Sequence, residues 1–120
     1  MNKILKSEIV KYEFKKYFDR LGGLHDSVLK NMLINFNLQT FELVICDPLA
    51  NFEGYKEYEY IENVKYTFYF DTIYMTDIEY DQGNLFIYDV IIKDSLIEIV
   101  FSPCGKVKTN IKYFICEVLK

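Results

Sequence analysis

The only histidine of the chain lies in a run of three residues that could do chemistry, His25, Asp26 and Ser27. Such a trio forms a nucleophilic unit when the acid orients the imidazole and the imidazole takes the hydroxyl proton. The run opens an alternating apolar segment, and consecutive side chains of a strand point to opposite faces. His25 and Asp26 would then not pair, and the sequence has no Gly-x-Ser-x-Gly elbow. A triad is therefore disfavoured, and a small hydrolytic enzyme that uses His25 is kept as an alternative.

A structural role explains the same three residues. Asp26 or Ser27 can bond backbone amides that are left free where a helix ends and a sheet begins. The two ring nitrogens of His25 can bridge two backbone groups. We predict that His25, Asp26 and Ser27 form a polar clamp that fixes a helix against the first hairpin.

The sequence gives no pattern that is typical of a metal or cofactor site. Cys46, Cys104 and Cys116 lack the paired spacing of zinc ligands or of a disulfide framework, which favours free, buried thiols in a reducing compartment. The glycines match no nucleotide-binding fingerprint. Four acids do not fit the calcium-loop spacing, namely Asp71, Asp77, Glu79 and Asp81. We therefore predict no metal and no cofactor.

Length and composition predict one domain over residues 1–120. Hydrophobic residues make up 51% of the chain and aromatic residues 18%, enough for a packed core. The first residues lack the apolar run of a signal peptide, and no segment has the roughly 18 apolar residues of a membrane span. The net charge of −4 disfavours direct nucleic-acid binding. We expect a cytoplasmic protein with no membrane partner.

The acidic charge is concentrated in one region that is also rich in tyrosine. Residues 47–81 carry nine acids against Lys56 and Lys65, a net of −7, and seven of the eleven tyrosines lie between residues 55 and 80. Tyrosine is enriched in interface hot spots, and acidic surfaces attract basic partners. An ordinary solvated strand surface is the alternative. The predicted contact residues for a basic protein are Tyr55, Glu57, Tyr58, Glu59, Tyr60, Glu62, Tyr69 and Asp77.

Apolar periodicity predicts one helix followed by strands. Residues 7–20 have helical spacing, with Ser7 as the N-cap and Gly22-Gly23 as the end. Period-two alternation predicts a first strand with Val28, Met32, Ile34, Phe36 and Leu38 on one face, joined by a tight turn to a second strand at 40–46. Further strands are expected at 61–70, 85–93, 95–102 and 106–118, while 72–80 is ambiguous. The strand at 85–93 is apolar on both faces, which predicts that it is covered on both sides.

These elements predict an α+β fold, in which an N-terminal helix packs on a curved, mainly antiparallel sheet of six or seven strands. Most consecutive strands are joined by short turns, which favours antiparallel pairing between them. Long edge strands would permit sheet pairing between two copies, so a homodimer is one expected partner state.

The order of features resembles a bacterial family. A short helix is followed by "LHDSVLKNMLINFNLQTFELVI", "VKYTFYFDTIYMTDIEY", "NLFIYDVIIKD" and the ending "SPCGKVKTNIKYFICEV". This order is similar to that of the immunity protein 50 family, whose members open their first strand with Leu-His-Asp-Ser or Leu-His-Asp-Ala. These proteins are found beside toxins in polymorphic toxin systems, the setting of contact-dependent growth inhibition.

The resemblance implies an immunity protein that binds one cognate toxin in the cytoplasm of the producing cell. The acidic region of this chain favours a basic toxin, such as a nuclease. The resemblance brings no catalytic residues, so we expect a protein-binding toxin inhibitor and not an enzyme. A structural or oligomerising β-rich module with an unknown partner is the alternative from a different class.

Overall fold

The computed structural model describes residues 5–46, 48, 63–78 and 85–119 of the chain. The described elements are β1 (Glu8–Val10), α1 (Phe14–Asp19), the short 3-10 helix η1 (Gly22–Leu24), β2 (Val28–Asn35), β3 (Thr40–Cys46), β4 (Asn63–Thr76), β5 (Leu85–Lys93), β6 (Leu96–Ser102) and β7 (Lys106–Leu119). All pairings between these strands are antiparallel. Among the described residues, no helix is long and apolar enough to cross a membrane.

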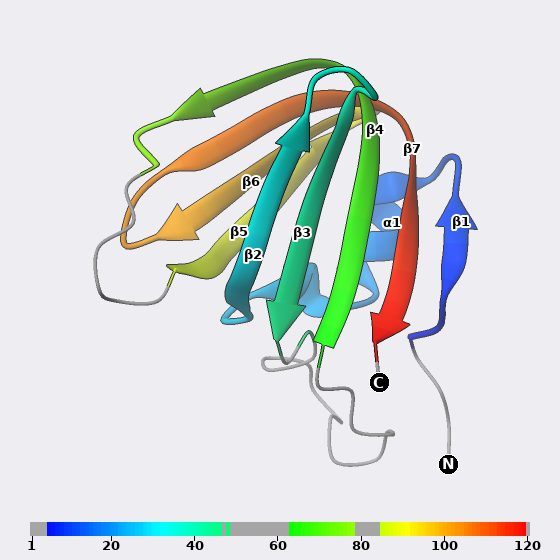
Figure 1. Cartoon of the computed structure of the whole chain (residues 1–120). Coiled ribbons are helices and arrows are strands. Elements are labelled where there is room, and N and C mark those ends of the chain that lie inside the picture. Colours follow the sequence, from blue (N-terminus) through cyan, green and yellow to red (C-terminus); the bar gives the residue numbers. More distant parts are fainter. Residues whose placement is uncertain (1–4, 47, 49–62, 79–84, 120) are drawn as a thin grey trace.

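Six strands close into an antiparallel barrel, and β1 adds to it from outside. The strand order is β1-β7-β4-β3-β2-β5-β6, and a further pairing of β6 with β7 closes the ring. The weakest joint is between β2 and β5, which are paired only through Val28 with Phe86 and Leu29 with Leu85. Figure 1 shows the strands wrapping around the interior, with α1 behind β4 and β7.

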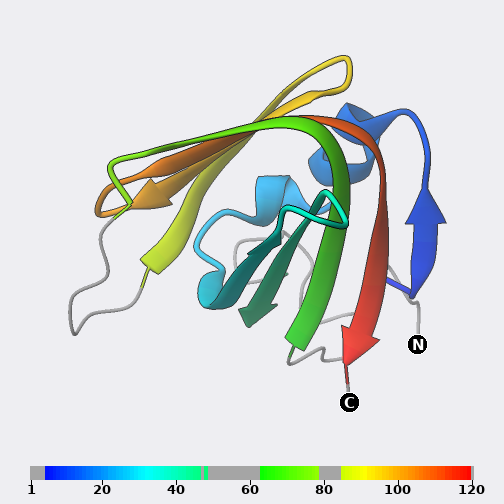
Figure 2. The ribbon, with the colours of Figure 1, turned by 45° about the horizontal axis from the view of Figure 1, so that its top comes forward.

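The barrel is built from two sheets that share the two longest strands. β4 and β7 have 14 residues each and are paired along their whole length. The first half of β4 and the second half of β7 form a front sheet with β1, β2 and β3. The second half of β4 and the first half of β7 form a rear sheet with β5 and β6. The register of β4 shifts twice between Tyr69 and Thr72, where bulges bend the strand from one sheet into the other. Figure 2 shows this bend at the top of β4.

The predicted α+β architecture is wrong. The domain is mostly β, a closed barrel with one short helix, and not a helix packed on an open sheet. Closure depends on the pairing of β6 with β7 and of β2 with β5, which join segments distant in the sequence. Local periodicity predicts most of the strands but not these long-range pairings, so an open sheet was the simpler expectation.

The predicted helix at 7–20 is also shorter than expected. Glu8–Val10 form β1 instead, and the hydroxyl of Ser7 accepts a hydrogen bond from the Val118 amide, 2.9 Å away, rather than capping a helix. The helix begins only after Glu13, whose left-handed backbone (φ 58°) separates strand from helix. Pairing with β7 has therefore overridden the helical spacing at the start of the segment.

Alternation along the strands was predicted correctly where it forms the core. Phe41, Leu43 and Ile45 of β3 are buried, as are the inward residues of β4, and the side chains between them face out. By contrast, β5 is not covered on both sides, since Phe86, Tyr88 and Ile91 are exposed. The interior is strongly aromatic, and its centre is a cluster of six rings from three elements, Phe14, Tyr17, Phe18, Tyr66, Phe68 and Phe114.

Candidate protein-binding surface

The outer face of the front sheet is a mixed aromatic and aliphatic surface. Cross-strand register places Ile9, Ile115, Thr67, Glu42 and Leu33 in one line across β1, β7, β4, β3 and β2. Ile9 and Leu33 are more than half exposed. Figure 1 shows no described element lying over this face. The sheet therefore offers apolar side chains to a partner at both ends of the line.

A pair of stacked tyrosines lies one row away on the same face. Tyr69 of β4 is directly opposite Tyr113 of β7, with ring centroids 4.5 Å apart and an interplanar angle of 16°. Both side chains are half-buried, so each ring supports the other while part of it meets solvent. Rigid aromatic side chains of this kind lose little conformational entropy on binding. Tyr69 was a predicted contact residue, whereas Tyr113 and Ile115 were missed.

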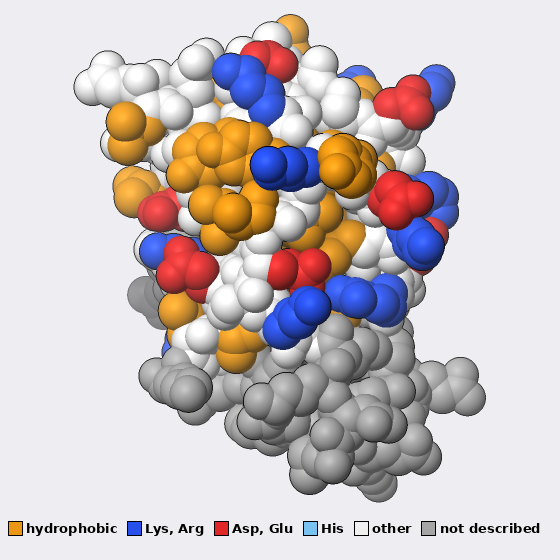
Figure 3. Space-filling view, turned by 90° about the vertical axis from the view of Figure 1, so that its right-hand side faces the viewer, with side chains coloured by type: hydrophobic (Ala, Val, Ile, Leu, Met, Phe, Trp, Pro, Cys, Tyr) orange, Lys and Arg blue, Asp and Glu red, His pale blue; other side chains and the backbone are white. Residues whose placement is uncertain are grey.

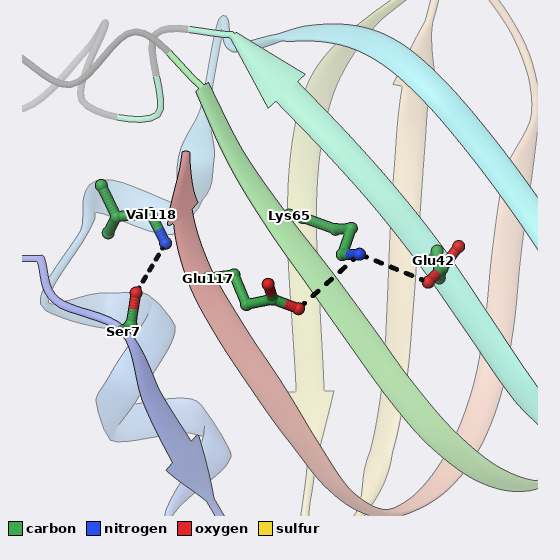
Figure 4. A network of polar contacts seen from close by, with 5 residues as sticks. All are labelled: Ser7, Glu42, Lys65, Glu117 and Val118. Carbon is green, nitrogen blue, oxygen red and sulfur yellow. Dashed lines mark hydrogen bonds and ion pairs between the residues drawn. The ribbon is translucent and has the colours of Figure 1, made fainter. Parts of the chain in front are cut away.

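Charged side chains lie among these apolar groups. The Lys65 ammonium lies 3.7 Å from the Glu42 carboxylate and 3.6 Å from that of Glu117, so one cation bridges three neighbouring strands (Figure 4). Lys112 lies 3.5 Å from Asp71 beyond the tyrosine pair. Figure 3 shows the adjoining side of the molecule, on which β1 lies, where hydrophobic side chains are also mixed with basic and acidic ones. On this face the Lys65 cluster thus lies on the three inner strands, and the exposed apolar side chains of Ile9 and Leu33 lie on the strands to either side.

The predicted contact residues are only partly covered by the structure. Tyr55, Glu57, Tyr58, Glu59, Tyr60 and Glu62 lie outside the described residues. Tyr69 is on the front sheet, while Asp77 is exposed just past the end of β4, beyond the bulges. The bend of β4 thus separates the two residues, with Tyr69 in the front sheet and Asp77 just past the rear-sheet end of the strand.

The turn between β2 and β3 carries the two most exposed apolar residues near this face. Phe36 is 74% exposed and Leu38 is 68% exposed. Both were predicted to continue the buried face of the first strand, and that prediction is wrong because β2 ends at Asn35. The apolar alternation runs past the end of the strand, so the pattern alone does not show where the chain turns. Asn35 and Asn37, which favour turns, were the available signal.

His25, Asp26 and Ser27 join the segment after α1 to β5. The Nδ1–H group of His25 donates to the carbonyl oxygen of Tyr88. The centroids of the two rings are 5.6 Å apart in an edge-to-face arrangement. The Asp26 amide donates to the Ile87 carbonyl (2.9 Å), and the Ile87 amide donates to the Ser27 carbonyl (2.8 Å). These three hydrogen bonds join the trio to β5, a strand that the clamp hypothesis did not name.

The trio does not have strand geometry, so the prediction that His25 and Asp26 point to opposite faces of a strand is wrong. Asp26 has a left-handed backbone (φ 68°) and precedes β2, which brings its carboxylate within 3.5 Å of His25 Nε2. Ser27 is fully buried, and His25 Nδ1 is occupied by a backbone carbonyl. A buried serine and an imidazole that is already hydrogen-bonded to the backbone fit a structural role better than a nucleophilic one. The clamp stays a prediction.

Changing His25 to alanine is expected to lower the free energy of unfolding by about 1 kcal/mol, because the Tyr88 carbonyl loses its side-chain donor. His25→Asn is the matched control, since its side-chain amide can donate from nearly the same position as Nδ1. Urea denaturation of the three proteins measures the effect. Equal stabilities of the alanine variant and the wild type would remove the clamp, and loss of a hydrolytic activity in both variants would favour the enzyme alternative.

A second polar group is buried inside the barrel. The hydroxyls of Tyr17 and Tyr66 are 3.2 Å apart, and the thiol of Cys116 lies beside them. Burial, followed by the charge of a neighbouring tyrosine or thiol, raises the pKa of both phenols far above the usual range. Burial also raises the pKa of the Cys116 thiol to about 11. All three groups therefore stay protonated near neutral pH, which argues against their use as nucleophiles.

The other two thiols differ from the expectation of buried cysteines. Cys46 and Cys104 are half-buried, whereas Cys116 is fully buried, and all three are free. Within residues 5–46, 48, 63–78 and 85–119, no three histidine, cysteine or acidic side chains are grouped to hold a metal ion. Comparison with known protein families, characterised proteins and solved structures found no match to this chain.

Proposed function

We propose that this protein is an immunity protein that binds a cognate bacterial toxin domain and neutralises it by covering it. The observation that carries the proposal is the outer face of the front sheet, where the half-buried, stacked Tyr69–Tyr113 pair is accompanied by the exposed side chains of Ile9 and Leu33. The resemblance of "LHDS" and the segments after it to a toxin-immunity family supports the same proposal. In this proposal the chain has no catalytic step and acts in the cytoplasm of the toxin-producing cell.

The toxin is proposed to be a basic protein, for example a nuclease. The region between residues 47 and 81 has a net charge of −7, and its described part includes Tyr69 of the binding face. Such an acidic region could occupy the site at which a basic toxin normally binds the phosphates of nucleic acid. Attraction between opposite net charges acts mainly on the association rate, because it guides the encounter before contact is made.

The direct test is co-expression with the toxin domain encoded beside the gene of this chain. We expect growth to be restored in cells that make both proteins, and the two to purify as a complex. Growth arrest together with the absence of a complex would reject the immunity function.

Charge reversal of Glu57, Glu59 and Glu62 to lysine is expected to slow association with that toxin domain about tenfold at low ionic strength, with a smaller effect in high salt. Stopped-flow association rates at two salt concentrations measure this. The control reverses Asp19, Asp94 and Glu98, which are described acids outside the acidic region and give the same change in net charge. Equal rates for the two triple variants would exclude residues 57–62 from the contact.

An oligomerising module is the second candidate, and one observation favours it. Among the described strands β1 pairs only with β7, so its other edge is the end of the described sheet. An open edge can accept a strand from a second copy. Light scattering of the purified chain tests this candidate. An oligomerising module is expected to be a dimer, and Ile9→Lys on the edge strand is expected to dissociate it.

A further inference from the structure

The tip of the β2–β3 hairpin, residues 36–39, presents two large apolar side chains to solvent. Phe36 and Leu38 are more exposed than the apolar residues of the neighbouring outer face. Burying a phenylalanine removes roughly 150–250 Å² of surface from water, so exposure of this degree is unfavourable in the isolated protein. A pair of such residues two positions apart in one turn is a candidate for the anchors that dominate binding energy in interfaces.

The tip is held in one conformation by contacts within the fold. The side-chain oxygen of Asn35 accepts a hydrogen bond from the Leu38 amide at 3.0 Å. The carbonyl oxygen of Gln39, a residue with left-handed backbone (φ 54°), accepts one from the Phe70 amide of β4, also at 3.0 Å. The turn is thus tied both to its own first strand and to the central strand of the sheet. A preorganised anchor loses less conformational entropy when it binds.

The charge of the tip decides which class of partner it fits. Residues 31–40 contain no charged side chain, and their polar side chains are the amides of Asn31, Asn35, Asn37 and Gln39 together with the hydroxyl of Thr40. A segment that inserts into an anionic membrane surface usually has lysine or arginine around its apolar residues. Neutral amides instead match the uncharged hydrogen-bonding groups of a protein cleft, because no charge has to leave water on binding.

The size of the tip argues for a concave partner and against a second copy. Two side chains supply at most about 400 Å² between them, about half of what each partner buries in a standard interface. Two protruding tips that meet would bury less than that. A cleft encloses the tip and leaves the adjoining outer face, with Leu33 and Tyr69, to supply the rest of the area.

We propose that Phe36 and Leu38 insert into an apolar cleft of the toxin domain, rimmed by neutral hydrogen-bonding groups. The inference rests on the proposed immunity function and names the part of this chain that enters the partner. The acidic region then speeds the encounter, whereas the tip determines how long the complex lasts. Charge at the acidic region and apolar contact at the tip should therefore affect different rate constants.

The experiment measures binding of the toxin domain encoded by the neighbouring gene to three forms of the full chain. These are the wild type, the double variant Phe36→Ser/Leu38→Ser, and the control Tyr74→Ser/Ile91→Ser. The control also removes one exposed aromatic and one exposed aliphatic residue, but from the rear sheet. Thermal midpoints of the variants verify that each is folded, which both are expected to be because all four side chains are exposed. Sedimentation with vesicles of phosphatidylserine and phosphatidylcholine is measured in parallel.

The tip variant is expected to bind at least tenfold more weakly, mainly through faster dissociation, while the control stays within twofold of the wild type. No form is expected to sediment with vesicles. If the wild type binds and the tip variant binds equally well, the tip inference fails and the immunity function stands. If the wild type does not bind the toxin, the immunity function fails and the tip inference with it. Vesicle binding that the tip variant loses would assign the tip to a membrane and overturn the protein cleft.

Discussion

Replacing Phe114 with alanine is expected to lower the free energy of unfolding by about 3–5 kcal/mol, the cost of emptying a well-packed aromatic site. Phe114 of β7 is fully buried at the centre of the ring cluster. The centroids of five rings lie within 5.8 Å of its own, those of Phe14, Tyr17, Phe18, Tyr66 and Phe68. Three of these rings belong to α1 and two to β4, so one side chain connects the helix to the sheet.

Urea denaturation followed by circular dichroism measures the effect, and Phe36→Ala is the control. It removes the same ring from a site that is 74% exposed, so its effect on stability is expected to stay within about 0.5 kcal/mol. Phe114→Leu should fall between the two because it leaves a smaller cavity. A loss of under about 1 kcal/mol in the alanine variant would mean that the cluster is not the centre of the core.

The inner faces of the strands could be predicted from the sequence because burial imposes a period of two on each strand. Val64, Tyr66, Phe68 and Phe70 alternate with outward residues in the printed order, and the structure places all four inside. The same reasoning made Tyr69 an outward-facing residue, and it lies half-buried on the outer face beside Tyr113. Tyr113 was missed because the partner across the sheet depends on register, which one strand does not reveal.

Closure of the barrel could not be predicted for the same kind of reason. The β2–β5 joint consists of two residue pairs, and the sequence around Leu29 and Leu85 resembles that of any buried strand end. The bend that lets β4 serve both sheets occurs at bulges near Phe70, where the apolar alternation simply loses phase. That loss of phase made residues 72–80 ambiguous, although residues 72–76 are strand.

The segments that carry the candidate site were predicted least well, since function favours exceptions to local rules. Phe36 and Leu38 continue an apolar alternation yet lie in a turn, and Ile9 has helical spacing yet lies on an edge strand. In each case an apolar residue that would normally be buried is exposed. In the proposed function, these exposed apolar residues are ones that the partner would cover.

Replacing Gly105 with alanine is expected to lower the free energy of unfolding by about 3 kcal/mol, combining backbone strain with a steric overlap. Gly105 lies in the turn between β6 and β7 at φ +98°, a conformation that residues with a side chain rarely adopt. An added Cβ would lie 2.9 Å from the Ile78 side chain and 3.0 Å from both the Asp77 carbonyl oxygen and the Ile78 Cα. Two of these three contacts are to backbone, which cannot move without shifting the chain that follows β4.

Gly23→Ala separates the two contributions to that loss. Gly23 also has a positive φ, +66°, but its nearest neighbour to an added Cβ is the Asp89 carboxylate at 4.0 Å, an ordinary contact. This variant should therefore lose only about 1 kcal/mol, the strain of the backbone alone. The difference of about 2 kcal/mol between the two variants, measured by urea denaturation, then reports the close approach of the β6–β7 turn to residues 77–78. Equal losses would show that the turn can move away, and that Gly105 is required for its conformation but not for the packing of β4 against β7.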